Sequence, residues 1–201
     1  MSTLPSGSES TRIQLLKQLV PAGSGGSQAG AAGRVRSLIE QLELEQPADL
    51  VRDQALLRGV WELRWSSSSL PYLAVAPWLE NLQLLDPARG RGMNLLRLAG
   101  PLGPVAGIAV QAAIAIEPVA AAAAEPAPPA QRVSVRFQRG GWLGPRIGQN
   151  RLQLLRKVKQ SFPAWLDITV VDEQLRVCRG NAGTLFVLLR RPDLSPESLM
   201  D

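Results

Sequence analysis

The closing stretch Trp165–Leu189 constrains the fold more than any other part of the chain. Three short runs rich in β-branched and large apolar residues begin within it, at Leu166–Val171, Leu175–Arg179 and Leu185–Arg190. Asp172-Glu173 separates the first two runs, and Gly180-Asn181-Ala182-Gly183 separates the last two, with residue types that favour tight turns. The stretch therefore predicts three consecutive strands joined by short turns.

The same period of two occurs further upstream. From Leu57 onward, large apolar residues alternate with a mostly charged face: Trp61, Leu63 and Trp65 on one side, Val60, Glu62 and Arg64 on the other. Further strand candidates lie at Asn81–Leu85, Met93–Ala99, Val110–Ile116 and Val133–Phe137. Seven or eight short strands in series predict a mainly β fold, an antiparallel barrel or sandwich.

The N-terminal part has a different pattern. Arg12–Val20 and Val35–Leu44 carry apolar residues at helical spacing, and the Gly/Ser/Ala-rich stretch Gly23–Gly33 between them is interpreted as a flexible connector. We therefore expect three parts: an N-terminal helical segment with a Gly/Ser-rich connector (1–54), a barrel (55–191) and an acidic tail (192–201).

Composition excludes several kinds of active site. The chain has no histidine and a single cysteine, Cys178. A Ser-His or Cys-His nucleophile pair and a cysteine-based zinc site are therefore excluded. We expect no catalytic residues, no metal and no cofactor, and a protein that is not an enzyme.

Charge is spread unevenly along the chain. Residues 131–191 hold 12 basic and 3 acidic side chains, whereas residues 1–130 hold 10 and 11. A basic C-terminal half indicates an anionic partner, either a membrane surface or nucleic acid, although a solvated exterior gives the same balance. Nucleic acid is the weaker reading, because only Phe137 and Trp142 in residues 131–160 could stack on bases. Arg151–Phe162 fits either a basic amphipathic helix on a membrane or a loop or irregular strand.

One acid of the basic half needs a partner. Asp167 lies in the middle of a strand pattern, which disfavours aspartate. Arg176 and Arg179 on the next strand are the natural candidates. We therefore predict a structural ion pair rather than a catalytic carboxylate.

Several motifs resemble known families. Gly59-Val60-Trp61 opens the first strand as in lipocalins, whose tryptophan plugs the closed end of the barrel beneath a stacked arginine. The chain over roughly residues 35–190 resembles the plastid lipid-associated protein (PAP)/fibrillin family. The resemblance rests on four segments: Leu56–Ser67, Gln131–Phe137, Ala164–Thr169 and Leu175–Leu188.

The resemblance implies a lipocalin-like barrel preceded by a helix and associated with thylakoid membranes or lipid bodies. It implies a lipid or isoprenoid ligand and no reaction. We expect the residues lining the interior to be Trp61, Leu63, Trp65, Ile114, Ile116, Val133, Val135 and Phe137. The structural motif would comprise Gly59, Trp61, Asp167, Arg176, Arg179 and Gly180, with Arg179 stacked on Trp61.

Two alternatives stay open at this point. The barrel could be filled by its own side chains and act only at a membrane surface, or it could bind nucleic acid through its basic surface. Met1–Thr11 is polar and lacks the apolar core of a secretory signal, and no transit peptide is recognised. We therefore expect a cyanobacterial-type protein, cytoplasmic or peripheral at the thylakoid membrane.

Overall fold

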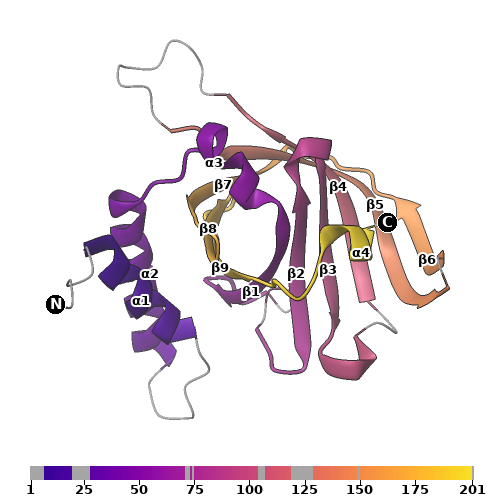
Figure 1. Cartoon of the computed structure of the whole chain (residues 1–201), viewed down its shortest axis with the longest axis horizontal. Helices are drawn as coiled ribbons and strands as arrows, with labels where there is room; N and C mark the ends of the chain where they lie inside the picture. The colour runs from indigo at the N-terminus through magenta and orange to yellow at the C-terminus, as the bar shows by residue number, and fades with distance from the viewer. Residues whose placement is uncertain are drawn as a thin grey trace.

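The computed structural model describes residues 7–19, 28–70, 73, 75–103, 107–118, 129–148 and 150–200. Nine strands form one antiparallel sheet (Figure 1). Their bounds are β1 Gly59–Ser66, β2 Leu79–Asp86, β3 Arg91–Leu98, β4 Gly107–Ile116, β5 Arg132–Ile147, β6 Asn150–Lys157, β7 Ala164–Val171, β8 Leu175–Gly180 and β9 Leu185–Arg190. Single turns of 3-10 helix lie at Pro87–Arg89 and Gly100–Leu102.

The sheet closes on itself. Its strand order is β4-β3-β2-β1-β9-β8-β7-β5-β6, and β4 also pairs with β5. That extra pairing joins the two sides and makes a barrel of eight strands, with β6 added beside β5. The predicted mainly β, lipocalin-like barrel with a preceding helical segment is confirmed.

Strand β5 is long enough to take part in two pairings along the same edge. Its first residues, Arg132–Val135, pair with β7, and its far half, from Arg139, pairs with β6. The far half and β6 form the β5–β6 hairpin, which extends from the barrel wall (Figure 1). The basic segment that fitted a helix or an irregular strand is therefore largely strand, because its residues pair with β5 from Asn150 to Lys157.

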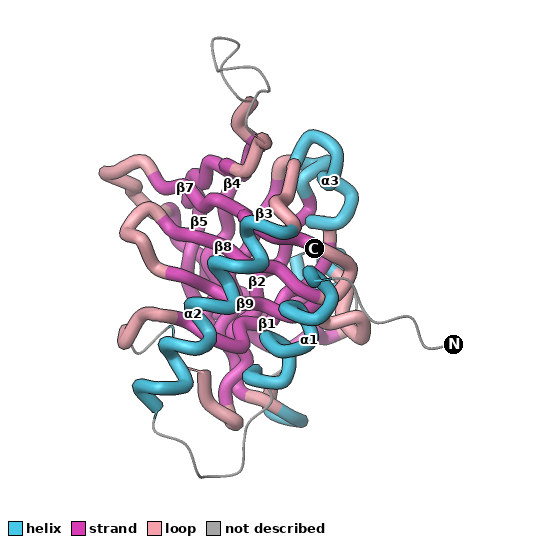
Figure 2. The backbone as a smooth tube through the Cα atoms, turned by 90° about the vertical axis from the view of Figure 1, so that its left-hand side faces the viewer, coloured by secondary structure: helices cyan, strands magenta, loops and turns pink. Residues whose placement is uncertain are grey.

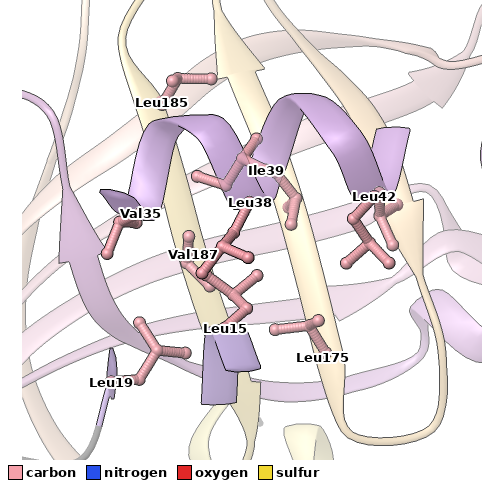
Figure 3. Close-up of a cluster of buried hydrophobic side chains, with 11 residues drawn as sticks. Leu15, Leu19, Val35, Leu38, Ile39, Leu42, Leu175, Leu185 and Val187 are labelled. Carbon is pink, nitrogen blue, oxygen red and sulfur yellow. The ribbon is translucent and has the colours of Figure 1, made fainter. Parts of the chain in front are cut away.

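Two N-terminal helices cover one side of the barrel. Helices α1 (Gly7–Leu19) and α2 (Gln28–Glu45) lie over the outer face of β8 and β9 (Figures 1 and 2). The buried cluster between them and the sheet contains Leu15, Leu19, Val35, Leu38, Ile39, Leu42, Val170, Leu175, Val177, Leu185 and Val187 (Figure 3). The apolar spacing that predicted the second helix is thus the spacing of its buried face.

Two further helices flank the barrel in the sequence, α3 before β1 and α4 after β9. Helix α3 (Leu50–Leu57) begins after Asp49, whose side chain accepts a hydrogen bond from the Val51 amide. It lies across one end of the barrel, at the top of Figure 1. In the acidic tail, helix α4 (Pro196–Met200) packs Leu199 into the outer cluster over β2 and β3.

The predicted connector between the first two helices lies partly outside the described residues. Helix α2 begins at Gln28, inside the stretch interpreted as a connector, because alanine favours helix strongly enough to extend it. Residues 20–27 of the connector region, and residues 119–128 of the Pro/Ala-rich segment before β5, lie outside the described part of the chain.

The two ends of the barrel differ. At the closed end, beneath α3, strand β1 begins at Gly59 and β9 ends at Arg190. At the mouth end, β1 ends at Ser66 and β9 begins at Leu185. The β5–β6 hairpin lies at the mouth end, because its far half pairs with the start of β4.

Candidate functional site

The barrel interior contains a cavity of about 380 Å³ that opens toward the mouth end. Apolar side chains form most of its wall. Three amide residues also line it: Gln83 on β2, Asn94 on β3 and Asn181 in the turn at the mouth. The apolar wall includes Leu85, Val110, Ala112, Ile114, Val133, Val135, Phe137, Leu166, Ile168 and Phe186. This volume lies at the lower end of the roughly 300–1,000 Å³ range of small-molecule sites.

The eight residues predicted to line the interior fall into three groups. Ile114, Val133, Val135 and Phe137 line this cavity. Ile116 instead lines a second cavity of about 320 Å³ beneath α3, which shares Leu85, Ile114 and Val133 with the first. The remaining three residues do not line either cavity.

Trp61 and Leu63 point into the barrel, but they pack within its core and do not line a cavity. Both are buried in the cluster below the cavity, where they pack with Leu57, Ile168 and Leu188. Side chains therefore fill the interior around Trp61 and Leu63, between the cavity at the mouth and the smaller cavity beneath α3.

Trp65 was predicted to line the interior, and that prediction is wrong. The pairing of β1 with β9 shifts between Leu63 and Trp65, so that Trp65 lies opposite Val187, an outward-facing residue. A β-bulge of one residue reverses the face that the following side chains occupy. Trp65 therefore packs beneath the helices against the outer cluster.

Trp61 is fully buried at the closed end, as the Gly-x-Trp motif predicted. Its indole Nε1 donates to the Leu57 carbonyl at 3.0 Å. Two guanidinium groups lie over its ring: that of Arg190 at 4.3 Å and that of Arg176 at 5.1 Å from the centroid. These distances are within the range of cation–π attraction.

Arg179 was predicted to stack on Trp61, and that prediction is wrong: Arg190 stacks most closely on its ring. Arg190 lies directly opposite Trp61 in the β1–β9 pairing and donates to the carbonyls of Leu56, Arg58 and Glu173. The alternation of Phe186, Leu188 and Arg190 on the inner face was the signal that could have identified it.

Arg179 faces outward instead and contacts a helix. Its Nε and Nη2 donate to the Glu43 carboxylate of α2 at 2.8 and 2.5 Å. Through hydrogen bonds to Glu43, the pKa of Arg179 is raised above its usual value. Arg179 therefore fastens the helical layer to β8.

Asp167 has a partner, but not the one predicted. Arg132 of β5 donates to both of its carboxylate oxygens, at 2.8 and 3.0 Å, and stacks over Trp165 at 3.8 Å. Arg132 and Arg179 both lie opposite Asp167, on its two neighbouring strands. The sequence indicated only β8, which follows β7 directly in the chain. The pairing with β5 joins residues far apart in the chain, and no local pattern indicates it.

Arg176 cannot reach Asp167, because the two side chains lie on opposite faces of the sheet. Asp167 pairs with Arg179, and Arg176, three positions earlier on β8, occupies the other face and points into the barrel. It is fully buried, and its Nη2 donates to the Gln83 side chain. Its Nε and Nη1 have no hydrogen-bond partner among the described residues.

The turn around Gly180 forms as predicted. The Gly183 amide donates to the Gly180 carbonyl at 2.8 Å, and Gly183 has the positive φ that glycine accommodates. Gly180 also lines the cavity, where an added Cβ would lie 3.3 Å from the Phe186 ring. The turn is therefore part of the cavity mouth.

Exposed apolar side chains gather at the mouth end. Of the large apolar residues that are exposed in the described parts of the chain, all except Leu44 and Val51 lie there or on the β5–β6 hairpin. This apolar rim consists of Leu70, Val75, Trp78, Leu98, Ile108, Trp142, Ile147, Leu152, Leu154, Val158 and Phe162. Trp142 and Leu154 lie opposite each other in the hairpin. Sequence patterns missed this surface, because it brings together ends of strands that are distant in the chain.

Comparison with known proteins agrees with this architecture. The PAP_fibrillin family model matches residues 14–189, nearly the whole chain. The chain belongs to the PAP/fibrillin family. The matched region includes α1 from Gln14 onward, all of α2 and α3, strands β1 to β8, and β9 as far as Leu189. No curated protein and no solved structure matches the chain.

Family membership and the β-barrel together support a lipid-associated structural protein. Among the described helices of this PAP/fibrillin protein, none has the length and hydropathy needed to cross a bilayer. Within the same residues, no three His, Cys, Asp or Glu side chains gather into a possible metal site.

Proposed function

We propose that this PAP/fibrillin protein is a non-enzymatic lipid-binding protein that holds one lipid or isoprenoid chain in its barrel. We further propose that it works peripherally at thylakoid membranes or lipid bodies. The observation that carries the proposal is the coincidence of two features at one end of the molecule: the cavity mouth and the apolar rim.

The cavity suits an apolar chain better than a polar solute. Its wall is mostly aliphatic and aromatic, with Ile114, Val135 and Phe137 on one side and Leu166 and Phe186 on the other. Removing ligand surface from water stabilises the bound state by about 25 cal/mol per Å². A hydrocarbon chain would therefore gain affinity along the whole depth of the cavity.

The apolar rim indicates how the molecule would be oriented on a membrane. Large exposed apolar clusters on soluble proteins mark contact sites for proteins or membranes. Phe162 and Leu70 line the cavity as well as belonging to the rim. A molecule that docks by its rim would therefore present its cavity to the lipid from which a ligand enters.

Charge on the hairpin favours an anionic surface. Residues 139–159 contain basic residues and no acidic residue. The exposed basic side chains are Arg139, Arg146, Arg156, Lys157 and Lys159. Each basic residue near an anionic lipid surface contributes about 1 kcal/mol of attraction. Apolar insertion and charge attraction then act on the same face of the molecule.

Vesicle flotation tests the docking face. We expect the protein to float with galactolipid vesicles that contain phosphatidylglycerol, and less with neutral galactolipid vesicles or at high salt. Leu154→Asp should reduce the bound fraction at least about tenfold, because a leucine that inserts gains about 1.5–3 kcal/mol. Leu44→Asp, at a similarly exposed site on α2, should float like the wild type.

Equal loss of flotation in the two variants would contradict docking through the rim. Mass spectrometry of lipid co-purified from a photosynthetic host tests the cavity separately. If the protein carries no lipid or pigment but still floats, it acts only as a structural protein at the membrane surface, and its cavity holds no ligand.

A further inference from the structure

The barrel interior contains a positive charge that no residue neutralises. Arg176 is fully buried, and its Nη2 donates to the neutral amide of Gln83. None of the ion pairs found among the described residues includes Arg176. The like charge of Arg190, which lies over the same Trp61 ring, adds to burial in lowering the pKa of Arg176. Buried charges in proteins are normally paired, because an isolated ion in a low-dielectric interior is strongly destabilising.

The surroundings of Arg176 offer no substitute for an anion. Burial lowers the pKa of the Arg176 guanidinium and raises the pKa of the neighbouring Cys178 thiol, so the thiol is neutral. Contact with the Trp61 ring gives only partial compensation. Two nitrogens, Nε and Nη1, therefore remain as unmet donors inside the barrel.

The unmet charge lies next to the cavity. Gln83, which accepts the hydrogen bond from Arg176, lines the cavity, and so does Asn94, its cross-strand neighbour. Cys178 and Leu188 are buried on the inner face beside Arg176. Arg176 itself is not among the lining residues, so a ligand that enters from the mouth would meet this charge where Gln83 faces the cavity.

We propose that the ligand of this barrel is a single-chain amphiphile with a carboxylate head, such as a long-chain fatty acid. Its carboxylate would accept hydrogen bonds from Arg176, with the Gln83 and Asn94 amides beside it, and its chain would fill the cavity toward the mouth. A carboxylate matches one guanidinium in charge and supplies the missing acceptors. This inference rests on the proposed function, because it assigns a chemical class to the ligand of the same cavity.

Binding of a fatty acid and of the alcohol of the same chain length tests the head group. Isothermal titration of delipidated full-length protein with hexadecanoate and with hexadecanol measures both affinities. The wild type should bind the acid at least about tenfold more tightly, since hydrogen bonds to a charged group discriminate by about that factor. Arg176→Met should lose this preference and keep the affinity for the alcohol.

Two further variants separate a binding role from a structural one. Arg176→Lys keeps the charge and should retain part of the preference for the acid. Arg36→Met removes an exposed arginine of α2 and should bind both ligands as the wild type does. Without ligand, Arg176→Met should melt no lower than the wild type, because it removes an uncompensated buried charge. If Arg176→Met does not fold, the affinities of Arg176→Lys for hexadecanoate and hexadecanol provide the test.

The outcomes distinguish the two proposals. Equal affinity of the wild type for acid and alcohol, or a preference that survives in Arg176→Met, would overturn the carboxylate site and leave the lipid-binding function standing. Failure of the wild type to bind either compound would overturn both. A markedly lower melting temperature of ligand-free Arg176→Met, with acid preference intact, would show that Arg176 is structural.

Discussion

Gly59 and Arg190 meet in a narrow space at the closed end of the barrel. Gly59 has φ of +150°, and an added Cβ would lie 2.4 Å from the Arg190 Nη1 atom. The Arg190 guanidinium stacks over Trp61 and hydrogen-bonds to three carbonyls, so it has little freedom to move away. The glycine of the Gly-x-Trp motif is therefore required by the position of this arginine.

At this scale we predict that Gly59→Ala lowers the free energy of unfolding by about 1–3 kcal/mol, through backbone strain and displacement of Arg190. Urea denaturation followed by tryptophan fluorescence would measure it. Gly33→Ala is the matched control, because Gly33 lies in α2 with nothing within 4 Å of an added Cβ. That control should be neutral or slightly stabilising. Equal stability of Gly59→Ala and the wild type would contradict the assigned role.

At the scale of elements, ion pairs join the helical layer to the barrel. Arg12 of α1 donates to the Asp172 carboxylate at 2.7 Å, and Glu43 of α2 pairs with Arg179. Asp172 also accepts from the Gln174 and Leu175 amides, both at 2.6 Å. One carboxylate thus shapes the β7–β8 turn and holds α1 against it.

Asp172 makes the docking of α1 dependent on pH. Burial raises the pKa of Asp172, but hydrogen bonds from Arg12 and from the two turn amides outweigh it and hold the pKa below its usual range. A carboxyl whose pKa is depressed in the folded state stabilises that state above the unfolded pKa of about 3.9. This stability is lost as the pH falls through the folded pKa.

We therefore predict that Asp172→Asn destabilises the protein by about 1–2 kcal/mol at pH 7, and that its difference from the wild type shrinks below about pH 4. Denaturation at the two pH values, with hydrogen exchange of the α1 amides, would measure both effects. Glu173→Gln changes the exposed neighbouring acid of the same turn and serves as the control. A difference between Asp172→Asn and the wild type that stayed constant with pH would count against the assignment.

On the scale of the whole molecule, the cavity and the apolar rim are separable. Ala112 faces the cavity from β4, whereas Ala113 lies on the outer face of the same strand. Ala112→Phe should occupy the cavity, reduce lipid co-purification at least severalfold and leave vesicle flotation unchanged, because the rim is untouched. Ala113→Phe should affect neither. Loss of flotation in Ala112→Phe would mean that membrane binding depends on a loaded cavity.

Local sequence patterns were sufficient to predict most of the strands and the buried face of α2. The period of two predicted the strands, because alternation of side chains across a sheet is a property of each strand alone. The helical spacing from Val35 to Leu42 predicted the buried face of α2 for the same reason. The Gly-x-Trp motif correctly indicated a buried Trp61 at the closed end.

The candidate site was less accessible to such patterns. The bulge after Leu63 turned Trp65 outward. Arg176 lies on the face opposite Asp167, because Asp167 pairs with Arg179 and side chains three positions apart on β8 point to opposite faces. Register shifts depend on the pairing of two strands, and one strand's sequence does not contain them. The roles predicted for Arg176 and Arg179 were wrong for another reason, since the partner of Asp167 comes from β5, a strand distant in the chain.

The sequence by itself determined a mainly β chain of PAP/fibrillin type with a helical segment before it, because alternation, turn residues and motifs are local. Only the tertiary structure decided the rest: the stacking of Arg190 on Trp61, the burial of Arg176 beside the cavity, and the apolar rim around the mouth. Each of these joins residues from distant strands, and closure of the barrel through the β4–β5 pairing brings those strands together. The uncompensated charge of Arg176 follows from that closure, since only a closed barrel removes the guanidinium from water.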